Sequence, residues 1–267
     1  MTKNFWVVTN PLTYRITEPI LNAAFLKIGF DGEFDSQAIE EAGLEEVIDK
    51  VRQGELSGVA VFTPHKGPSL AYCDEVSDEI KAIGALNYLQ MEGDKLVGYN
   101  LDWEGALRAI KVEVPDLTDK HILVLGAGGA GRAVAYYGLK EGAKVTLWNR
   151  TTEKAKKFAE SIGINWIEDL EMLDEKPHII VNATRVSTQD RQRSLLPYKL
   201  WENVELAMES VCRLTSLFLE EAKAMNVQHI IDGDDWAAHQ SNALLRHITG
   251  KEIPLEDMHK IVLEVLD

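Results

Sequence analysis

The sequence predicts an α/β protein of two domains, and three patterns support that fold class. Strand-like and helix-like segments alternate over the whole length of 267 residues. From residue 121 onward the strand-like segments are continuous apolar runs between helical patterns, which is typical of a parallel sheet covered on both faces. Between the two parts, PDLTDK at 115–120 has the composition of a junction.

The first hundred residues predict short strands and helices in mixed order. We expect strands at 4–9 and 57–63, and a hairpin over 85–100 that turns at 92–94. A helix is expected over 17–27, with Thr17 as its N-cap and Pro19 in the first turn. The remaining helical patterns cover 37–52, 67–73, 75–83 and 102–112.

The second part predicts a sheet of buried strands. The expected strands cover 121–125, 144–148, 178–183, 203–209 and 228–232. The helical patterns at 234–249 and 255–266 have no strand after them, and we expect these terminal helices to pack back on the first domain. The expected domains are therefore 1–103 together with 237–267, and 104–236.

The composition excludes several classes of partner. The chain has 28 Lys and Arg against 43 Asp and Glu, a net charge of −15, which is the wrong sign for nucleic acid or an anionic membrane surface. A small anionic ligand in a local basic pocket remains compatible with this charge. No apolar run is long enough for a signal peptide or a membrane-spanning helix, which predicts a cytoplasmic protein. Cys73 and Cys212 predict reduced thiols, and no metal-ligand spacing occurs.

A glycine-rich loop follows the strand at 121–125 and precedes a helix, the context in which G-x-G-x-x-G binds a dinucleotide. Gly126 permits the tight turn, Gly128 lets the backbone approach a pyrophosphate, and Gly131 lets the helix pack close to the strand. The pyrophosphate would lie on the helix N-terminus. The loop residues expected to contact it are Gly126, Gly128, Gly129, Ala130 and Gly131. The alternative is a purely structural glycine turn.

The end of the next strand indicates which dinucleotide binds. Sites that prefer NAD usually place a carboxylate there for the ribose 2′-hydroxyl. This chain has Asn149, Arg150 and Thr151 instead, with Lys154 one turn later. Two cations and a hydroxyl suit the 2′-phosphate of NADP. The alternatives are NAD or dual use, and no cofactor at all. In a purely structural interpretation, Thr151 or Thr152 only caps a helix and Arg150 is a solvated charge.

Lys66 and Asp102 are the candidate reactive pair. Lys66 follows a buried strand in FTPHK, and Asp102 begins a helix in GYNLD at the domain junction. A lysine and an aspartate in one cleft can transfer protons. The alternative is that both are ordinary surface charges.

At this point the chain resembles the shikimate/quinate dehydrogenases over nearly its whole length. The motifs that carry the resemblance occur in the family's order: TNPLTYRITEPILNAAF at 9–25, VAVFTPHK at 59–66, DEVSDEIKAIGALNYL at 74–89, GYNLDWEG at 98–105, GAGGAGRA at 126–133, NRTTEKA at 149–155 and VNAT at 181–184. The resemblance implies a substrate domain followed by a Rossmann-like NADP domain. It also implies a place in aromatic amino acid biosynthesis.

The resemblance implies reversible hydride transfer between NADP and a hydroxyl-bearing ring carbon of shikimate or a related cyclic hydroxy acid. Lys66 would move the hydroxyl proton and Asp102 would orient Lys66. The family's remaining roles fall on substrate-binding Arg15, Thr17, Asn87, Asn100 and Gln240, and on cofactor-binding Asn182, Ala183, Thr184 and Gly233.

The departures from the family concentrate in the substrate half. Arg15 and Thr17 stand where the family has two serines for the substrate carboxylate. Phe62 replaces a threonine of the lysine strand and Ala60 replaces an asparagine. Tyr88 and Leu101 stand at two further threonine positions of the family. Its Asp-x-x-Tyr-x-Pro in the fifth strand region appears as Ala207, Ser210 and Cys212. Because a site that hydrogen-bonds a substrate hydroxyl is strongly selective, these losses predict a changed substrate.

Three alternatives stay open. One is a dehydrogenase of another polyol, such as quinate or aminoshikimate. The second is an NADP-binding sensor or scaffold without turnover. The third is the architecturally similar methylene-tetrahydrofolate dehydrogenase, whose loop signature differs from GAGGAG. Two domains around a cleft also suggest hinge closure on binding, whereas the sequence predicts no particular oligomeric state.

Overall fold

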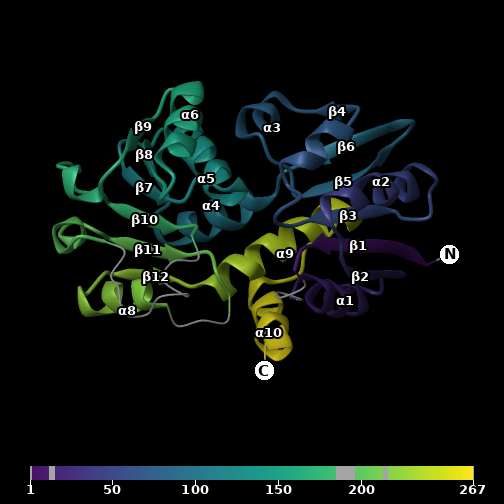
Figure 1. Cartoon of the computed structure of the whole chain (residues 1–267). Coiled ribbons are helices and arrows are strands. Elements are labelled where there is room, and N and C mark those ends of the chain that lie inside the picture. Colours follow the sequence, from purple (N-terminus) through teal and green to yellow (C-terminus); the bar gives the residue numbers. More distant parts are fainter. Residues whose placement is uncertain (1, 12–15, 185–195, 213–215, 267) are drawn as a thin grey trace. The chain divides into compact units, whose positions relative to one another are not determined.

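The computed structural model describes residues 2–11, 16–184, 196–212 and 216–266. The chain divides into two compact units, Met1–Asp102 with Gln240–Asp267, and Trp103–His239. Each unit is built on its own six-stranded sheet (Figure 1). In the part of the chain that is described, no helix combines the length and apolar character needed to cross a membrane.

The sheet of the first unit has the strand order β2-β1-β3-β5-β6-β4. β1 runs parallel to β2 and β3, β3 is antiparallel to β5, and β4 is parallel to β6. β5 and β6 pair antiparallel as the predicted hairpin. The strands are β1 Lys3–Thr9, β2 Gly32–Ala38, β3 Gly58–Val61, β4 Glu75–Val76, β5 Tyr88–Glu92 and β6 Lys95–Tyr99.

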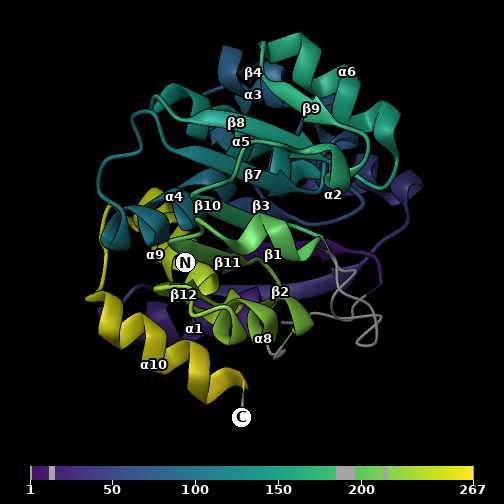
Figure 2. The same cartoon turned by 90° about the vertical axis from the view of Figure 1, so that its left-hand side faces the viewer.

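Apolar faces of short helices cover this sheet. The helices and helical turns that belong to it are α1 Thr17–Ile28, η1 Glu41–Gly43, α2 Leu44–Arg52, η2 Pro68–Tyr72, α3 Asp78–Ile83, the C-terminal part of α9 Gly233–Thr249, and α10 Leu255–Leu266. α2 packs Val47, Ile48 and Val51 against strand residues of one core cluster. α10 lies beside α1 in both views (Figures 1 and 2), where Lys27 and Asp257 form an ion pair at 3.3 Å.

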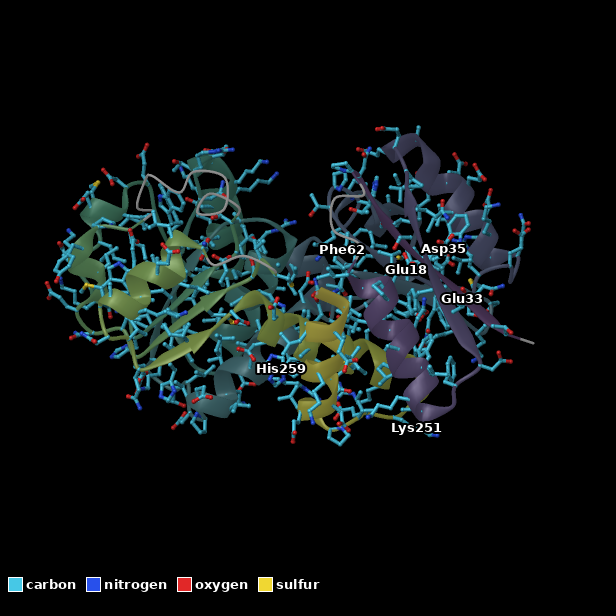
Figure 3. All side chains as sticks on the ribbon, turned by 90° about the horizontal axis from the view of Figure 1, so that it is seen from below. Glu18, Glu33, Asp35, Phe62, Lys251 and His259 are labelled. Carbon is cyan, nitrogen blue, oxygen red and sulfur yellow. The ribbon has the colours of Figure 1, made fainter. Side chains whose placement is uncertain are left out.

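The helix predicted over 37–52 is wrong in its first part. Gln37 lies within β2, and α2 begins only at Leu44. β2 alternates, with Phe34 and Ser36 buried while Glu33 and Asp35 point outward (Figure 3). The sequence does not predict this strand because its composition is polar. Contacts with other parts of the first unit determine its extended conformation. Among these contacts, the Asn22 side chain of α1 donates to the Phe34 carbonyl at 3.0 Å and accepts from its N–H at 2.7 Å.

Two further local expectations need correction. Thr17 is the first residue of α1 rather than its N-cap, a position held by Ile16 without a side-chain hydrogen bond. The helix expected over 75–83 begins only at Asp78, because Glu75–Val76 pairs with β6 as a strand. Ser77 caps that helix by accepting the Ile80 N–H at 3.3 Å.

The sheet of the second unit is entirely parallel, as predicted, with the order β12-β11-β10-β7-β8-β9. Figure 2 shows these strands in that succession. They are β7 His121–Leu125, β8 Lys144–Trp148, β9 Asn165–Ile167, β10 Ile179–Asn182, β11 Leu206–Glu209 and β12 His229–Ile231. Only β9, a three-residue edge strand, was not expected.

Helices cover both faces of this sheet, which makes it doubly wound. One core cluster joins the strands to α4 Asp102–Glu113, α5 Gly129–Lys140 and α6 Thr152–Ile162. A second joins the opposite face to α8 Leu217–Ala224 and to the helical turns η3 Leu170–Met172 and η4 Tyr198–Trp201. β7 and β10 are neighbours, but the chain continues from β7 to β8 on one side and from β10 to β11 on the other. Ligands of such folds bind at the carboxyl ends of the strands at this switch point.

Packing around Gly58 provides a test of the first unit. A Cβ there would lie 2.1 Å from the Tyr88 hydroxyl oxygen and 3.1 Å from the Leu89 carbonyl oxygen. We expect Gly58→Ala to lower the free energy of unfolding by about 1–3 kcal/mol through overpacking, measured by urea denaturation. Gly43→Ala is the control, because its Cβ would meet only Ile39 Cβ at 3.6 Å. Equal stability of the two variants would contradict this account of the packing.

Candidate active site

The glycine loop after β7 has room for backbone but not for side chains. Gly126 has a φ of +111°, and a Cβ there would lie 2.9 Å from the Ala183 carbonyl oxygen. A Cβ on Gly131 would lie 1.9 Å from the Gly126 carbonyl oxygen, so only glycine lets α5 approach the loop this closely. A Cβ on Gly128, by contrast, would face open space. The loop therefore has the form that the motif predicts.

The start of α5 offers backbone donors to an anion. α5 begins at Gly129, so the N–H groups of Gly129, Ala130 and Gly131 have no carbonyl within the helix to bond. Asn149 fixes the loop beside them, because its Oδ1 accepts the Ala127 N–H at 3.0 Å and its Nδ2 donates to the Thr151 carbonyl at 2.9 Å. This donor set fits a pyrophosphate.

Arg150, Thr151 and Lys154 follow β8 and are exposed. Thr151 occupies the N-cap position of α6, yet its side chain makes no capping hydrogen bond. The alternative interpretation, in which Thr151 serves only to cap α6, is therefore not supported by a hydrogen bond from its hydroxyl. Two cations and a hydroxyl at the end of β8 form an arrangement that suits a ribose 2′-phosphate.

The remaining predicted cofactor residues lie at the end of β10 and beside the end of β11. Asn182 Oδ1 accepts the N–H and the hydroxyl of Thr184, at 3.1 and 2.7 Å. Gly233 begins α9 directly against the end of β11, since a Cβ there would lie 2.2 Å from the carbonyl carbon of Val211. Every cofactor residue predicted from the sequence thus belongs to the second unit, at or near the carboxyl edge of its sheet.

In the first unit, Lys66 and Asp102 form an ion pair. Lys66 Nζ lies 2.9 Å from Asp102 Oδ1 and 2.7 Å from Oδ2. Their side chains are only 13% and 2% exposed, so neither is an ordinary surface charge. β3 and the turn after it carry Lys66, whereas Asp102 begins α4. The structure therefore joins two residues that are far apart in the sequence.

Two amides complete the surroundings of the Asp102 carboxylate. Asn87 Nδ2 and Gln240 Nε2 both donate to Asp102 Oδ1, at 2.9 and 2.6 Å. Asn87 Oδ1 also accepts the Leu101 N–H at 2.7 Å. Asn100 supports the same segment, because its Oδ1 accepts the Asp102 N–H at 3.0 Å. The sequence did not indicate that Asn87 and Gln240 bond to Asp102.

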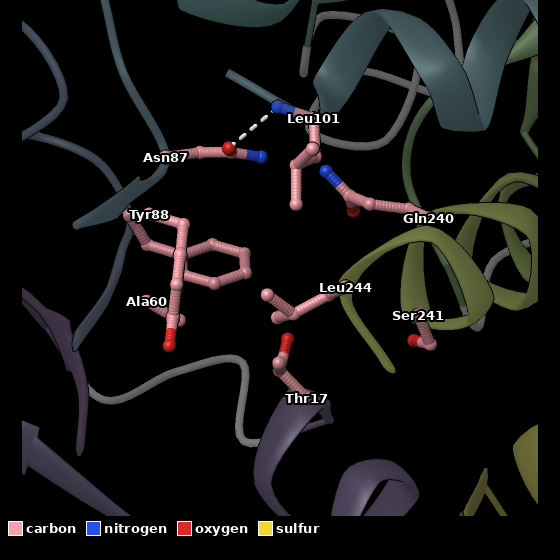
Figure 4. Close-up of a pocket in the computed structure, with 9 residues that line it drawn as sticks. Thr17, Ala60, Asn87, Tyr88, Leu101, Gln240, Ser241 and Leu244 are labelled. Carbon is pink, nitrogen blue, oxygen red and sulfur yellow. Dashed lines mark hydrogen bonds between the residues drawn. The ribbon is translucent and has the colours of Figure 1, made fainter. Parts of the chain in front are cut away.

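A pocket of about 320 Å³, its open mouth included, adjoins this cluster. Figure 4 shows Asn87 and Gln240 on one side and the Thr17 hydroxyl on the other. The residues that line it are Thr17, Ala60, Phe62, Asn87, Tyr88, Leu101, Gln240, Ser241 and Leu244. Most of its walls are apolar. Arg15, the other residue expected to hold a substrate carboxylate, lies outside the described residues.

Phe62 and His65 flank the lysine. The Phe62 ring lies 5.4 Å from Lys66 Nζ, within the range of a cation–π interaction. His65 is fully buried and its Nε2 contacts the Ile39 carbonyl oxygen at 3.0 Å, a setting that favours a structural role. Among the described residues, no group of three His, Cys, Asp or Glu side chains could hold a metal ion.

The doubly wound second unit with its glycine loop, together with the buried lysine–aspartate pair beside a pocket in the first unit, defines the class of dinucleotide-dependent oxidoreductases. Family models agree. Residues 7–89 match the shikimate dehydrogenase substrate binding domain, and residues 108–194 match shikimate / quinate 5-dehydrogenase.

Individual relatives point to the same family. The shikimate dehydrogenase (NADP(+)) of Aquifex aeolicus is 32% identical, over 95% of this chain and 93% of the relative. That of Pyrococcus furiosus is 34% identical, over 98% and 96%. The crystal structure of Thermus thermophilus shikimate 5-dehydrogenase, in complex with NADP(H) and shikimate, aligns with a TM-score of 0.89 at 33% identity and covers 99% of this chain and 100% of that one. The chain belongs to the shikimate dehydrogenase family.

His65 gives the pH dependence of stability a testable sign. Burial lowers the pKa of its imidazole below the ordinary value of 6.5, an effect that its hydrogen bond to Ile39 partly offsets. The unfolded chain therefore binds this proton more readily, and stability falls as the pH drops below that ordinary value.

In His65→Gln the amide nitrogen can replace Nε2 as donor to Ile39 without binding a proton. When the pH is lowered from about 7 to about 5, we expect the free energy of unfolding to fall less in the variant than in the unsubstituted chain. Urea denaturation at each pH measures this difference. His121, whose pKa burial also lowers, is present in both proteins and cancels in the comparison. Identical slopes would rule out a buried neutral His65.

Proposed function

We propose that this chain is an NADP-dependent oxidoreductase that interconverts a hydroxyl and a keto group on shikimate or a related cyclic hydroxy acid. The observation that carries the proposal is the buried pair of Lys66 and Asp102, joined at 2.7 and 2.9 Å beside a pocket. Residues 1–103 with 237–267 take the substrate role in this proposal, and residues 104–236 take the nucleotide role.

Lys66 is the proton-transfer group. On reduction its ammonium donates a proton to the keto oxygen as the hydride arrives at the ring carbon. On oxidation the neutral amine accepts the hydroxyl proton and becomes the ammonium again. Asp102 holds Lys66 in place with both carboxylate oxygens, and Asn87 and Gln240 in turn hold Asp102 through its Oδ1. A proton donor fixed in this way needs little reorganisation when the oxygen changes charge.

The remaining polar groups orient the ring. Asn87, Asn100 and Gln240 are assigned to its other hydroxyls, and each amide has hydrogen-bonding capacity beyond the contacts described. Arg15 and Thr17 are assigned to the carboxylate, for which a guanidinium and a hydroxyl are suitable partners. The Thr17 side chain lines the pocket.

NADP supplies or accepts the hydride when it is bound. Gly128, the first N–H groups of α5 and the Asn149-ordered loop would hold its pyrophosphate. Arg150, Thr151 and Lys154 would hold the 2′-phosphate, and Asn182, Ala183, Thr184 and Gly233 would line the nicotinamide half.

The apolar pocket wall favours a second candidate within the same chemistry. The side chains of Ala60, Phe62 and Leu101 offer no hydrogen bond to a ring hydroxyl on their side of the pocket. A cyclic hydroxy acid that lacks a hydroxyl facing this wall would bind without leaving that hydroxyl unpaired. Initial rates of NADP⁺ reduction with shikimate, quinate and deoxygenated ring acids separate the two candidates. NADPH binding without turnover of any compound would instead favour the sensor or scaffold.

Replacement of Lys66 tests the mechanism. We expect Lys66→Met to lower kcat by about 10²- to 10⁴-fold, because general acid–base catalysis contributes a factor of that size. NADPH affinity, measured by fluorescence, should stay unchanged. Lys81→Met, at an exposed lysine paired with Asp78, is the control and should keep full activity. Turnover that survives in Lys66→Met would refute the assigned proton transfer.

Replacement of Arg150 tests cofactor choice. We expect Arg150→Ala to weaken NADPH binding by about tenfold, the value of one charge-assisted hydrogen bond, and to leave the weaker NADH binding unchanged. Lys157→Ala, at an exposed position of α6, is the control. The readout is a fluorescence titration with each nucleotide. An equal loss for both nucleotides would count against recognition of the 2′-phosphate by Arg150.

A further inference from the structure

A fully buried carboxylate in the second unit has no part in the mechanism above. Glu209 ends β11 and its side chain, like that of Asn182 at the end of β10, is 0% exposed. β10 and β11 are parallel neighbours in which Asn182 pairs with Glu209. No sequence motif drew attention to this residue. A buried carboxylate is retained only where its hydrogen bonds are satisfied.

The hydrogen bonds of Glu209 connect the two strand ends. Its Oε2 accepts from Asn182 Nδ2 at 2.9 Å. Its Oε1 accepts the backbone N–H groups of Ser210 and Val211, at 3.0 and 3.3 Å. Asn182 Oδ1 then accepts both donors of Thr184. These hydrogen bonds form a relay that runs from the Ser210 and Val211 N–H groups through Glu209 and Asn182 to Thr184. Each acceptor in this relay faces a donor, so the carboxylate determines which way the Asn182 amide points.

Both segments held by this relay pack against nucleotide-binding glycines. On the β10 side, Ala183 lies so close to Gly126 that a Cβ there would be 2.9 Å from its carbonyl oxygen. On the β11 side, Val211 lies against Gly233, where a Cβ would be 2.2 Å from the Val211 carbonyl oxygen. Glu209 therefore joins the wall beside the glycine loop to the wall beside α9.

We propose that Glu209 is a positioning residue that holds the ends of β10 and β11 in the shape required by the nicotinamide half of NADP. The inference rests on the proposed function, because it takes NADP as the ligand. Glu209 acts through Asn182, Thr184 and the Val211 backbone, and it does not itself touch the cofactor. The phosphate loop is also held by other contacts, such as those of Asn149, so the adenine half depends on Glu209 much less than the nicotinamide half.

A donor–acceptor exchange tests this relay. Glu209→Gln keeps an oxygen for the Ser210 and Val211 N–H groups but turns an amide donor toward the Asn182 donor. Asn182→Asp alone turns a second carboxylate toward Glu209. Combined, the two substitutions restore the pattern, because the amide introduced on β11 donates to the carboxylate introduced on β10, whose other oxygen accepts from Thr184. The double variant also keeps the net charge of the unsubstituted chain.

The measurement is fluorescence titration with NADPH, alongside calorimetric titration with 2′-phospho-ADP-ribose, which lacks the nicotinamide. We expect each single variant to bind NADPH about tenfold more weakly, since each leaves a buried polar group mismatched. The double variant should return to within about threefold of the unsubstituted chain. Affinity for 2′-phospho-ADP-ribose should change by less than about threefold throughout, because Asn149 holds the phosphate loop independently. Glu220→Gln, the same exchange at an exposed position of α8, is the control.

The possible failures are distinguishable. Single variants that bind NADPH like the unsubstituted chain would overturn this inference alone, as would a double variant in which the two losses simply add. Equal losses for NADPH and 2′-phospho-ADP-ribose would reduce Glu209 to a general structural role and also overturn it. Failure of the unsubstituted chain to bind NADPH would overturn the proposed function, and this inference with it.

Discussion

The buried charge of Asp102 is the constraint on which the first unit depends. Removing a carboxylate from water costs several kcal/mol, on the order of the penalty for any buried ion, unless donors surround it. Here the donors come from the turn after β3, the segment that leads into β5, and α9. These three segments must reach one point for the charge to be tolerated. The chemistry and the folding of this unit therefore impose the same requirement on the chain.

The second unit has a different requirement, because its glycine loop must present backbone N–H groups, rather than side chains, to a ligand. Gly126 and Gly131 leave no room for a Cβ, and their close approach places the start of α5 at the end of β7. Asn149 then secures the loop from the neighbouring strand. Cationic side chains enter only at the rim, where Arg150 and Lys154 are exposed. A polyanion suits such a surface, since it meets backbone donors at its centre and cations at its edge.

The sequence predicted those parts of the fold and site that local pattern determines. The parallel strands were evident because burial on both faces leaves continuous apolar runs, as in HILVL at 121–125. β2 was missed because polar residues such as Asp35 and Gln37 carry no strand signal, and pairing with β1 decides its conformation. Lys66 and Asp102 could be paired with any assurance only through resemblance to a family. The bonds from Asn87 and Gln240 to Asp102, and the relay through Glu209, depend on contacts between distant segments that no spacing reveals.

The residues on the apolar side of the pocket can be substituted more freely than the other residues of the site. Lys66, Asn87 and Gln240 are tied to one carboxylate, so a change at any of them alters the setting of the others and their effects are epistatic. The side chains of Ala60 and Leu101 line the same pocket outside that set of bonds. Selection can therefore exchange them one at a time while the ion pair of Lys66 and Asp102 stays intact. Under the proposed function, a change of substrate would therefore evolve through the apolar wall. The residues bonded to Asp102 would be conserved or replaced together.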